Sequence, residues 1–85
     1  MGRVTFIYKN DTSIIQDIYV EPWPKRYTMR PGEVLAMAWD PSKDDPNTVE
    51  MIVHEEGITF WLNFEGDELE ITIDGKPAEK RDWAN

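Results

Sequence analysis

The sequence predicts an all-β fold, either a small antiparallel sandwich or a partly closed barrel of seven or eight short strands. Three observations lead to this prediction. Apolar and polar residues alternate with a period of two in one segment after another, as they do in strands that bury one face. Turn-forming residues recur roughly every ten positions, which is typical of sandwiches and barrels. No segment of useful length has a helical period, and the chain contains no internal repeat.

The 85 residues are expected to form a single domain, with residues 80–85 as a last turn or a loose tail. Folding a chain of this length removes roughly 64% of its surface from water, which is enough for an independent core. No apolar run approaches the roughly 20 residues of a membrane helix. The first residues lead directly into a strand pattern without a secretory apolar region, so we expect a cytoplasmic protein. The absence of cysteine excludes a disulfide scaffold and a thiolate zinc site.

The first two strands are expected at residues 4–8 and 14–20. A cluster of turn-forming residues at 9–11 separates them. Prolines in residues 21–24 end the second strand, because proline donates no backbone hydrogen bond to a sheet. The apolar residues that share one face of the second strand are Ile14, Ile18 and Val20.

A hairpin is expected from residues 26–30 and 33–39, which flank Pro31-Gly32. Proline sets φ for the first central position of a type II turn, and glycine accepts the positive φ that the second requires. The resulting register pairs Arg30 with Glu33, Met29 with Val34 and Tyr27 with Ala36.

After a long loop at 40–47, residues 48–55 and 58–65 are expected to form a second hairpin. Only a loop of two or four residues around Glu56-Gly57 keeps the apolar residues of both strands on one core-facing side. Those residues are Val49, Met51, Val53, Ile58, Phe60, Leu62 and Phe64.

The C-terminal third predicts two further turns. Gly66-Asp67 leads into a strand at 68–74, which is expected to pair back onto its predecessor. The expected pairs are Phe64 with Leu69, Leu62 with Ile71 and Phe60 with Ile73. Asp74-Gly75 is a strong hairpin dipeptide and precedes a short edge segment at 76–79 that contains Pro77.

The formal net charge of −8 argues against nucleic acid and anionic membranes as partners. Residues 1–30 carry five basic and three acidic residues, whereas residues 31–85 carry four basic and fourteen acidic residues. The basic cluster of Lys25, Arg26 and Arg30 is too small to outweigh this acidic remainder. We expect an acidic, solubilising surface, with docking of a basic partner as the alternative.

No constellation of residues predicts catalysis, a metal or a cofactor. The single histidine, His54, is in phase with Glu50 and is expected to point outward. Glu68 and Glu70 share a strand face, but their polar neighbours argue against a buried acid–base pair. The acidic loop at 40–47 lacks the alternating acids, central glycine and terminal glutamate of a calcium-binding EF-hand. We therefore expect a protein that is not an enzyme.

One turn supports a resemblance to a known architecture. Pro31-Gly32-Glu33 is similar to a turn found in many β-sandwich domains, cupredoxin-like domains among them. A cupredoxin holds copper with a cysteine and histidines, whereas this chain has no cysteine and one histidine. The resemblance therefore implies no copper site here.

Tryptophan is abundant, at positions 23, 39, 61 and 83. Trp61 is in phase with Thr59 and Asn63, on the side of its strand opposite the core. The segment 33–39 is apolar on both faces, so something must cover its second face. The cover is the chain's own loops together with Trp83, a second copy of the chain, or a ligand such as a sugar ring or an extended peptide.

The sequence therefore favours a non-catalytic interaction or assembly module that forms a homodimer or binds another protein. The surface expected to carry this contact consists of Trp23, Met37, Trp39, Ile52 and Trp61. One alternative is a module that binds a small ligand or carbohydrate on an exposed tryptophan-containing sheet face. Another is an acidic docking protein for a basic partner.

Overall fold

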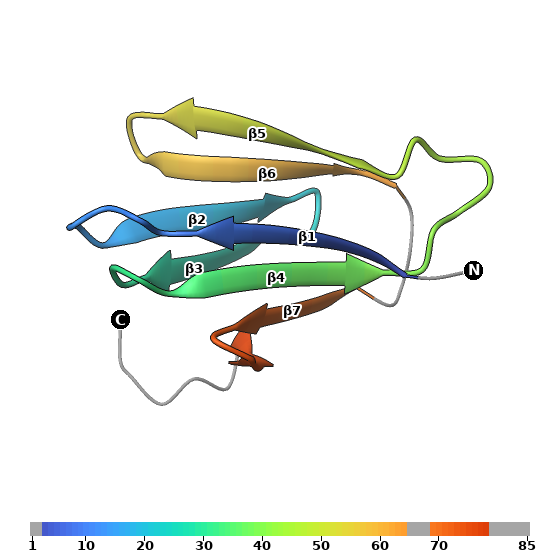
Figure 1. Ribbon diagram of the computed structural model, residues 1–85. Helices are drawn as coiled ribbons and strands as arrows, with labels where there is room; N and C mark the ends of the chain where they lie inside the picture. The colour runs from blue at the N-terminus through green and yellow to red at the C-terminus, as the bar shows by residue number, and fades with distance from the viewer. Residues whose placement is uncertain (1–2, 65–68, 79–85) are drawn as a thin grey trace.

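Alternating apolar and polar residues build two four-stranded sheets in the computed structural model, which describes residues 3–64 and 69–78 (Figure 1). Sheet A contains, in spatial order, β1 (Val4–Lys9), β4 (Val34–Trp39), β7 (Glu70–Ile73) and β8 (Lys76–Pro77). Sheet B contains β3 (Lys25–Met29), β2 (Gln16–Glu21), β6 (Gly57–Asn63) and β5 (Thr48–His54). Neighbouring strands are antiparallel except β2 and β6, which run parallel. The all-β prediction is confirmed, and the two sheets form an open sandwich rather than a closed barrel.

The core lies between the sheets and takes about every second side chain of most strands. Phe60 of β6 is fully buried, and its ring lies edge-on to Phe6 at 5.2 Å and to Tyr8 at 5.3 Å between centroids. Trp39 stacks on Phe64 at 4.2 Å with an interplanar angle of 10°. Because Phe6 and Tyr8 belong to β1, the edge of sheet A covers β6 of sheet B.

The turn at Pro31-Gly32 forms, but the hairpin expected around it is wrong. Gly32 has a φ of +88°, as the turn requires. The Arg30 backbone N–H donates to the Glu33 carboxylate at 2.6 Å, so these two residues do meet. However, β3 then pairs with β2, and β4 pairs with β1 and β7, so the turn links the two sheets. The expected pairs of Met29 with Val34 and Tyr27 with Ala36 therefore do not form.

The pairing expected between residues 58–65 and 68–74 is also wrong. In the structure β7 pairs with β4, with Met37 opposite Ile71 and Leu35 opposite Ile73. Residues that were expected to be cross-strand partners instead belong to opposite sheets of one core. The physical reason is that facing sheets bury the same alternating residues as paired strands do. Gly66 and Asp67 lie outside the described residues.

Two predicted hairpins are confirmed. β5 and β6 are joined by a two-residue loop, Glu55-Glu56, which keeps Val53 opposite Ile58 and Met51 opposite Phe60. β7 and β8 turn at Asp74 and Gly75, whose φ angles of 53° and 80° match the left-handed conformations of a type I′ turn. The described part of the edge segment expected at 76–79 contains β8. Residues 80–85, with Trp83, lie outside the described residues.

A buried asparagine closes one corner of the sandwich. Asn10 is fully buried, and its Nδ2 donates to the carbonyl oxygens of Ile14 and Met29, each at 3.0 Å. Its Oδ1 accepts from the N–H of Thr12 at 3.2 Å and from the Thr12 hydroxyl at 2.6 Å. The Asn10 backbone also bonds to Gly32 and Glu33 of the inter-sheet turn. Every polar group of Asn10 therefore has a hydrogen-bond partner, which avoids the free-energy cost of burying an unpaired polar group.

Candidate functional site

Two of the five residues of the predicted interaction surface lie in the core. Met37 is 0% exposed and Trp39 is 2% exposed, so the prediction that they are on the surface is wrong. β4 turns its bulky residues inward and its small ones outward, because the bulky ones fill the space between the sheets. The outward residues are Val34, Ala36 and Ala38, which are half-buried.

The other three residues lie at two separate places. Trp23, in the link between β2 and β3, is half-buried and its ring lies 5.4 Å from that of Phe64, so it extends the core. Ile52 and Trp61 lie on the outer face of sheet B and are 41% and 42% exposed. Their direct cross-strand partners are Thr59 and Glu50, which makes Ile52 and Trp61 diagonal neighbours. Only this pair matches the surface expected from the sequence.

A larger apolar surface lies where a buried one was expected. Met51 and Val53 face the same side as the core residues of β6, yet they are 52% and 68% exposed. Ile14 and Ile15, which were expected to lie in a strand, precede β2 and are also exposed. We call these four residues the β5 flank. A surface depression of about 370 Å³, lined by residues 14–17 and 53–58, connects its two halves.

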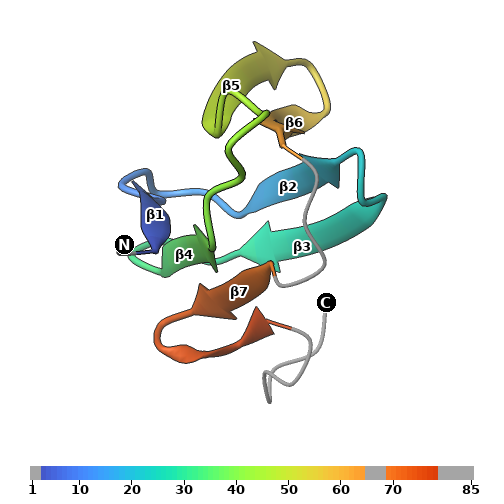
Figure 2. The same cartoon turned by 90° about the vertical axis from the view of Figure 1, so that its right-hand side faces the viewer.

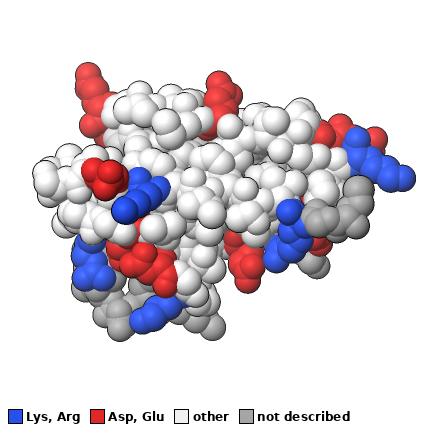
Figure 3. Space-filling model, viewed as in Figure 1, with Lys and Arg blue, Asp and Glu red and all other residues white. Residues whose placement is uncertain are grey.

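The cause of this exposure is the offset between the two sheets. β1, the edge of sheet A, reaches β6 but not β5, and β5 lies beyond β1 in both Figure 1 and Figure 2. The space-filling view from the side of sheet A shows a largely uncharged surface over β5 and β6 (Figure 3). No pattern within the sequence signals this offset, because it depends on how far one sheet extends over the other.

The backbone of β5 is unpaired along its outer edge, since β5 is the last strand of sheet B and pairs only with β6. Edge strands are usually protected from further pairing by lysine, proline or short length. Of the four edge strands in the described residues, β8 has two residues including Pro77, β3 carries Lys25 and Arg26, and β1 ends at Lys9. The seven residues of β5 include no lysine, arginine or proline.

The outer face of sheet B carries a row of three residues in direct register: Glu21 of β2, Trp61 of β6 and Glu50 of β5. We call this set the Trp61 row. In the neighbouring row, the Arg26 guanidinium lies over the ring of Tyr19, 5.8 Å from its centroid. The same guanidinium approaches the Asp17 carboxylate at 3.4 Å.

His54 lies on this outer face and is exposed, as expected. Its Nε2 is 2.9 Å from the Thr59 hydroxyl, its Nδ1 accepts from the N–H of Glu56 at 3.2 Å, and its ring packs against Tyr19. Both ring nitrogens are therefore engaged in holding the hairpin end. Because Nδ1 is held by a backbone N–H rather than by a carboxylate, the Thr59–His54 pair lacks the acid that orients the histidine of a catalytic triad.

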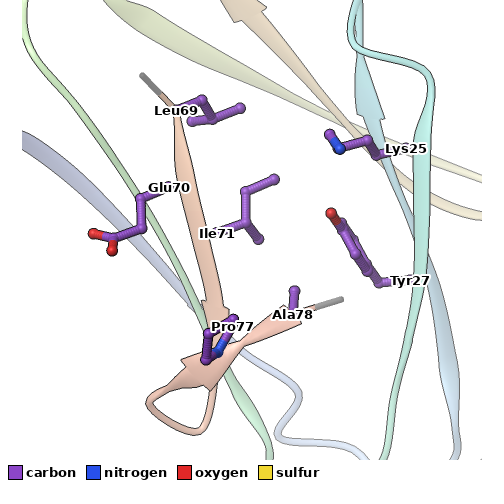
Figure 4. A pocket seen from close by; sticks show the side chains of 7 residues that line it. All are labelled: Lys25, Tyr27, Leu69, Glu70, Ile71, Pro77 and Ala78. Carbon is purple, nitrogen blue, oxygen red and sulfur yellow. The ribbon is translucent and has the colours of Figure 1, made fainter. Parts of the chain in front are cut away.

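A second cavity, of about 300 Å³, lies on the opposite flank between β3 and the β7–β8 hairpin (Figure 4). Tyr27 and Lys25 line one side, and Leu69 and Ile71 line the other. The Glu70 side chain points away from these apolar residues (Figure 4). The described lining contains no serine, cysteine or histidine, so it offers no nucleophile–base pair.

Within residues 3–64 and 69–78, no group of three or more histidine, cysteine or acidic residues is arranged to hold a metal ion. The same part of the chain contains no helix that is long and apolar enough to cross a membrane. The β5 flank with its free strand edge lies at one end of sheet B, and the Trp61 row lies on the outer face of the same sheet. No family model, curated protein or solved structure matches this chain.

Proposed function

We propose that the protein is a non-catalytic assembly module in which a second copy of the chain pairs with the free edge of β5. The observation that carries this proposal is the combination of an edge strand that contains no lysine, arginine or proline with apolar side chains exposed on both of its faces. Backbone hydrogen bonds along such an edge supply affinity, and side chains on the two faces supply specificity. Exposed apolar surface of this kind typically marks an interaction site.

The sequence of β5 is complementary to itself in antiparallel pairing. With the two-fold axis at Ile52, Met51 lies opposite the partner's Val53, and the two Ile52 side chains meet on the outer face. Glu50 then lies opposite the partner's His54 rather than opposite a second carboxylate, which would be destabilising. A two-fold contact uses the same patch on both subunits, so this self-complementarity favours a second copy over an unrelated strand.

The net charge of the chain favours the same location. Two copies that each carry −8 repel each other, so a stable contact needs a surface with little charge. The four residues of the β5 flank are apolar, and the acidic residues Asp17, Glu55 and Glu56 line the depression beside them. Salt screens repulsion between exposed charges, so the dimer is expected to tighten as ionic strength rises.

The test is the mass in solution, measured by light scattering after gel filtration over a hundredfold range of protein concentration. We expect the mass to rise from the chain mass of 10.0 kDa to about twice that value. Val53→Lys places a charge against the partner's Met51 and is expected to weaken the dimer by at least ~10-fold, or about 1.4 kcal/mol.

The matched control is Ile7→Lys. Ile7 is 65% exposed and lies on β1, the edge strand of sheet A, so it resembles Val53 in exposure but not in location. We expect this variant to dimerise like the wild type, and circular dichroism establishes that both variants fold. A mass that stays at 10.0 kDa at all concentrations contradicts the proposal. Equal weakening by the two variants contradicts the assignment to β5.

A further inference from the structure

The Trp61 row is an aromatic ring between two carboxylates on an open sheet face. Neighbouring strands of a sheet lie about 4.7–4.9 Å apart, so both carboxylates lie within reach of the space above the indole. Trp61 is 42% exposed, although this ring is the largest apolar side chain on that face. Among the described residues, neither Glu21 nor Glu50 forms an ion pair.

The neighbouring row on the same face shows how such an arrangement is completed. There Arg26 lies opposite Tyr19 and over its ring, and the same guanidinium approaches the carboxylate of Asp17, two residues before Tyr19 on β2. The Trp61 row has the same two components, with a stronger cation-binding ring and a second carboxylate, but it has no cation from the described chain. The protein therefore fills one of two similar positions with its own arginine and leaves the other without one.

We propose that the Trp61 row binds an arginine side chain of a partner protein. The guanidinium stacks on the indole of Trp61, and its N–H groups donate to the carboxylates of Glu21 and Glu50. Indole is the best aromatic partner for a cation, and a planar guanidinium both stacks on rings and matches carboxylate geometry. The bound guanidinium also reduces the repulsion between the carboxylates of Glu21 and Glu50, which lie on either side of Trp61. The acidic net charge of the chain favours basic partners.

The chemistry favours arginine over the other ring-binding ligands. A neutral sugar would stack on the indole but would leave the negative charge of the two carboxylates uncompensated. A lysine ammonium would neutralise charge, but it is a point charge that does not stack and is more strongly hydrated. Glu50 belongs to β5, the strand that is proposed to pair with a second copy, whereas Glu21 and Trp61 belong to β2 and β6. Variants of Glu21 and Trp61 therefore test this site without changing the β5 edge.

The experiment is a nuclear magnetic resonance titration that follows the indole N–H signal of Trp61. The probe is a ten-residue glycine–serine peptide with two arginines. A peptide with citrulline in place of arginine, which has the same shape without the charge, is the neutral comparison. We expect the Trp61 signal to shift with the arginine peptide and not with the citrulline peptide. The shift should weaken as salt increases, opposite to the salt dependence expected for the dimer.

Variants test the assignment residue by residue. Glu21→Gln keeps the size of the side chain and is expected to weaken binding of the arginine peptide about 10-fold. Trp61→Leu is expected to abolish binding, measured by calorimetry. The matched control is Glu55→Gln, an exposed glutamate in the β5–β6 loop, which is expected to bind the peptide like the wild type.

Three results would overturn the proposal. One is an unshifted Trp61 signal with the arginine peptide, whatever the mass measurement shows. Another is an equal response to the citrulline peptide or to neutral oligosaccharides, which would indicate stacking without charge recognition. The third is unchanged affinity in Glu21→Gln, which would remove the carboxylates from the site. None of these results bears on the β5 edge, so the two proposals fail separately.

Discussion

Phe60 and Met51 are directly opposed residues on one face of sheet B, yet their environments differ completely. Phe60 is 0% exposed and contacts two rings of β1, whereas Met51 is 52% exposed. Val53 and Ile58 repeat the contrast one pair further along, at 68% and 7% exposed. Residue type does not explain these differences, because all four side chains are apolar and face the same side.

The difference lies in what the opposite sheet covers. The side chains of β1, the edge strand of sheet A, reach Phe60 of β6, and β5 lies further out with no strand of sheet A opposite it. Figure 2 shows β5 beyond the strands of sheet A. A strand of this composition is stable at the end of a sheet, but it leaves apolar side chains and backbone groups available to a partner. The fold thus leaves apolar side chains exposed on a strand that the opposite sheet does not cover.

Truncating the side chains of Phe60 and Met51 tests this contrast and gives the largest expected change in the free energy of unfolding. Phe60→Ala is expected to lower the free energy of unfolding by about 3–5 kcal/mol, because it leaves a cavity between the sheets. Met51→Ala is expected to change the same quantity by less than ~0.5 kcal/mol in the monomer, because Met51 is 52% exposed and no strand of sheet A lies opposite it. The measurement is urea unfolding followed by circular dichroism at a concentration at which the protein is monomeric.

A milder variant covers the case in which Phe60→Ala does not fold. Phe60→Leu retains much of the side-chain volume and is expected to cost about 1 kcal/mol, still more than Met51→Ala. Equal losses at positions 60 and 51 would show that β5 is covered within the monomer. That result would remove the basis for a partner at this strand.

A smaller change in the free energy of unfolding is expected at the corner of the sandwich that Asn10 closes. Asn10→Ala removes hydrogen bonds that satisfy a buried carbonyl of Met29 and hold the loop after β1, and is expected to cost about 2–3 kcal/mol in urea unfolding. Asp11→Ala, at the exposed neighbouring position, is expected to cost less than ~0.5 kcal/mol. Similar values for the two variants would show that the Asn10 hydrogen bonds do not stabilise this corner.

The fold could be predicted from the sequence at the level of strands and turns, but not at the level of sheet order. Alternation located most strands to within a few residues. Keeping one apolar side required an even-numbered β5–β6 loop but left its length and exact position open, and the loop is Glu55-Glu56. The partners of β4 and β7 were wrong because local alternation is the same whether two strands pair side by side or face each other across a core. Asn10 was recognised only as part of a turn, since nothing in its local sequence signals burial.

The candidate site was predicted in part, for the same reason. Trp61 and Ile52 were placed outward correctly, because the phase of a strand is a local property. Met37 and Trp39 were assigned to the surface because β4 is apolar on both faces, and the sequence does not say which face is inward. The exposure of Met51 and Val53 depends on how far sheet A extends, which is decided by contacts between residues far apart in the chain.

Amide hydrogen exchange along β5, at low and at high protein concentration, tests most directly whether a second copy of the chain pairs with this edge. In the monomer, the amides of β5 that point away from β6 have no strand to bond to and should exchange rapidly. We predict that these amides exchange at least ~10-fold more slowly at high concentration, while the outward amides of β3 and β1 are unchanged. If exchange along β5 is independent of concentration, or if β1 is protected instead, the central claim that a second copy pairs with the β5 edge is wrong.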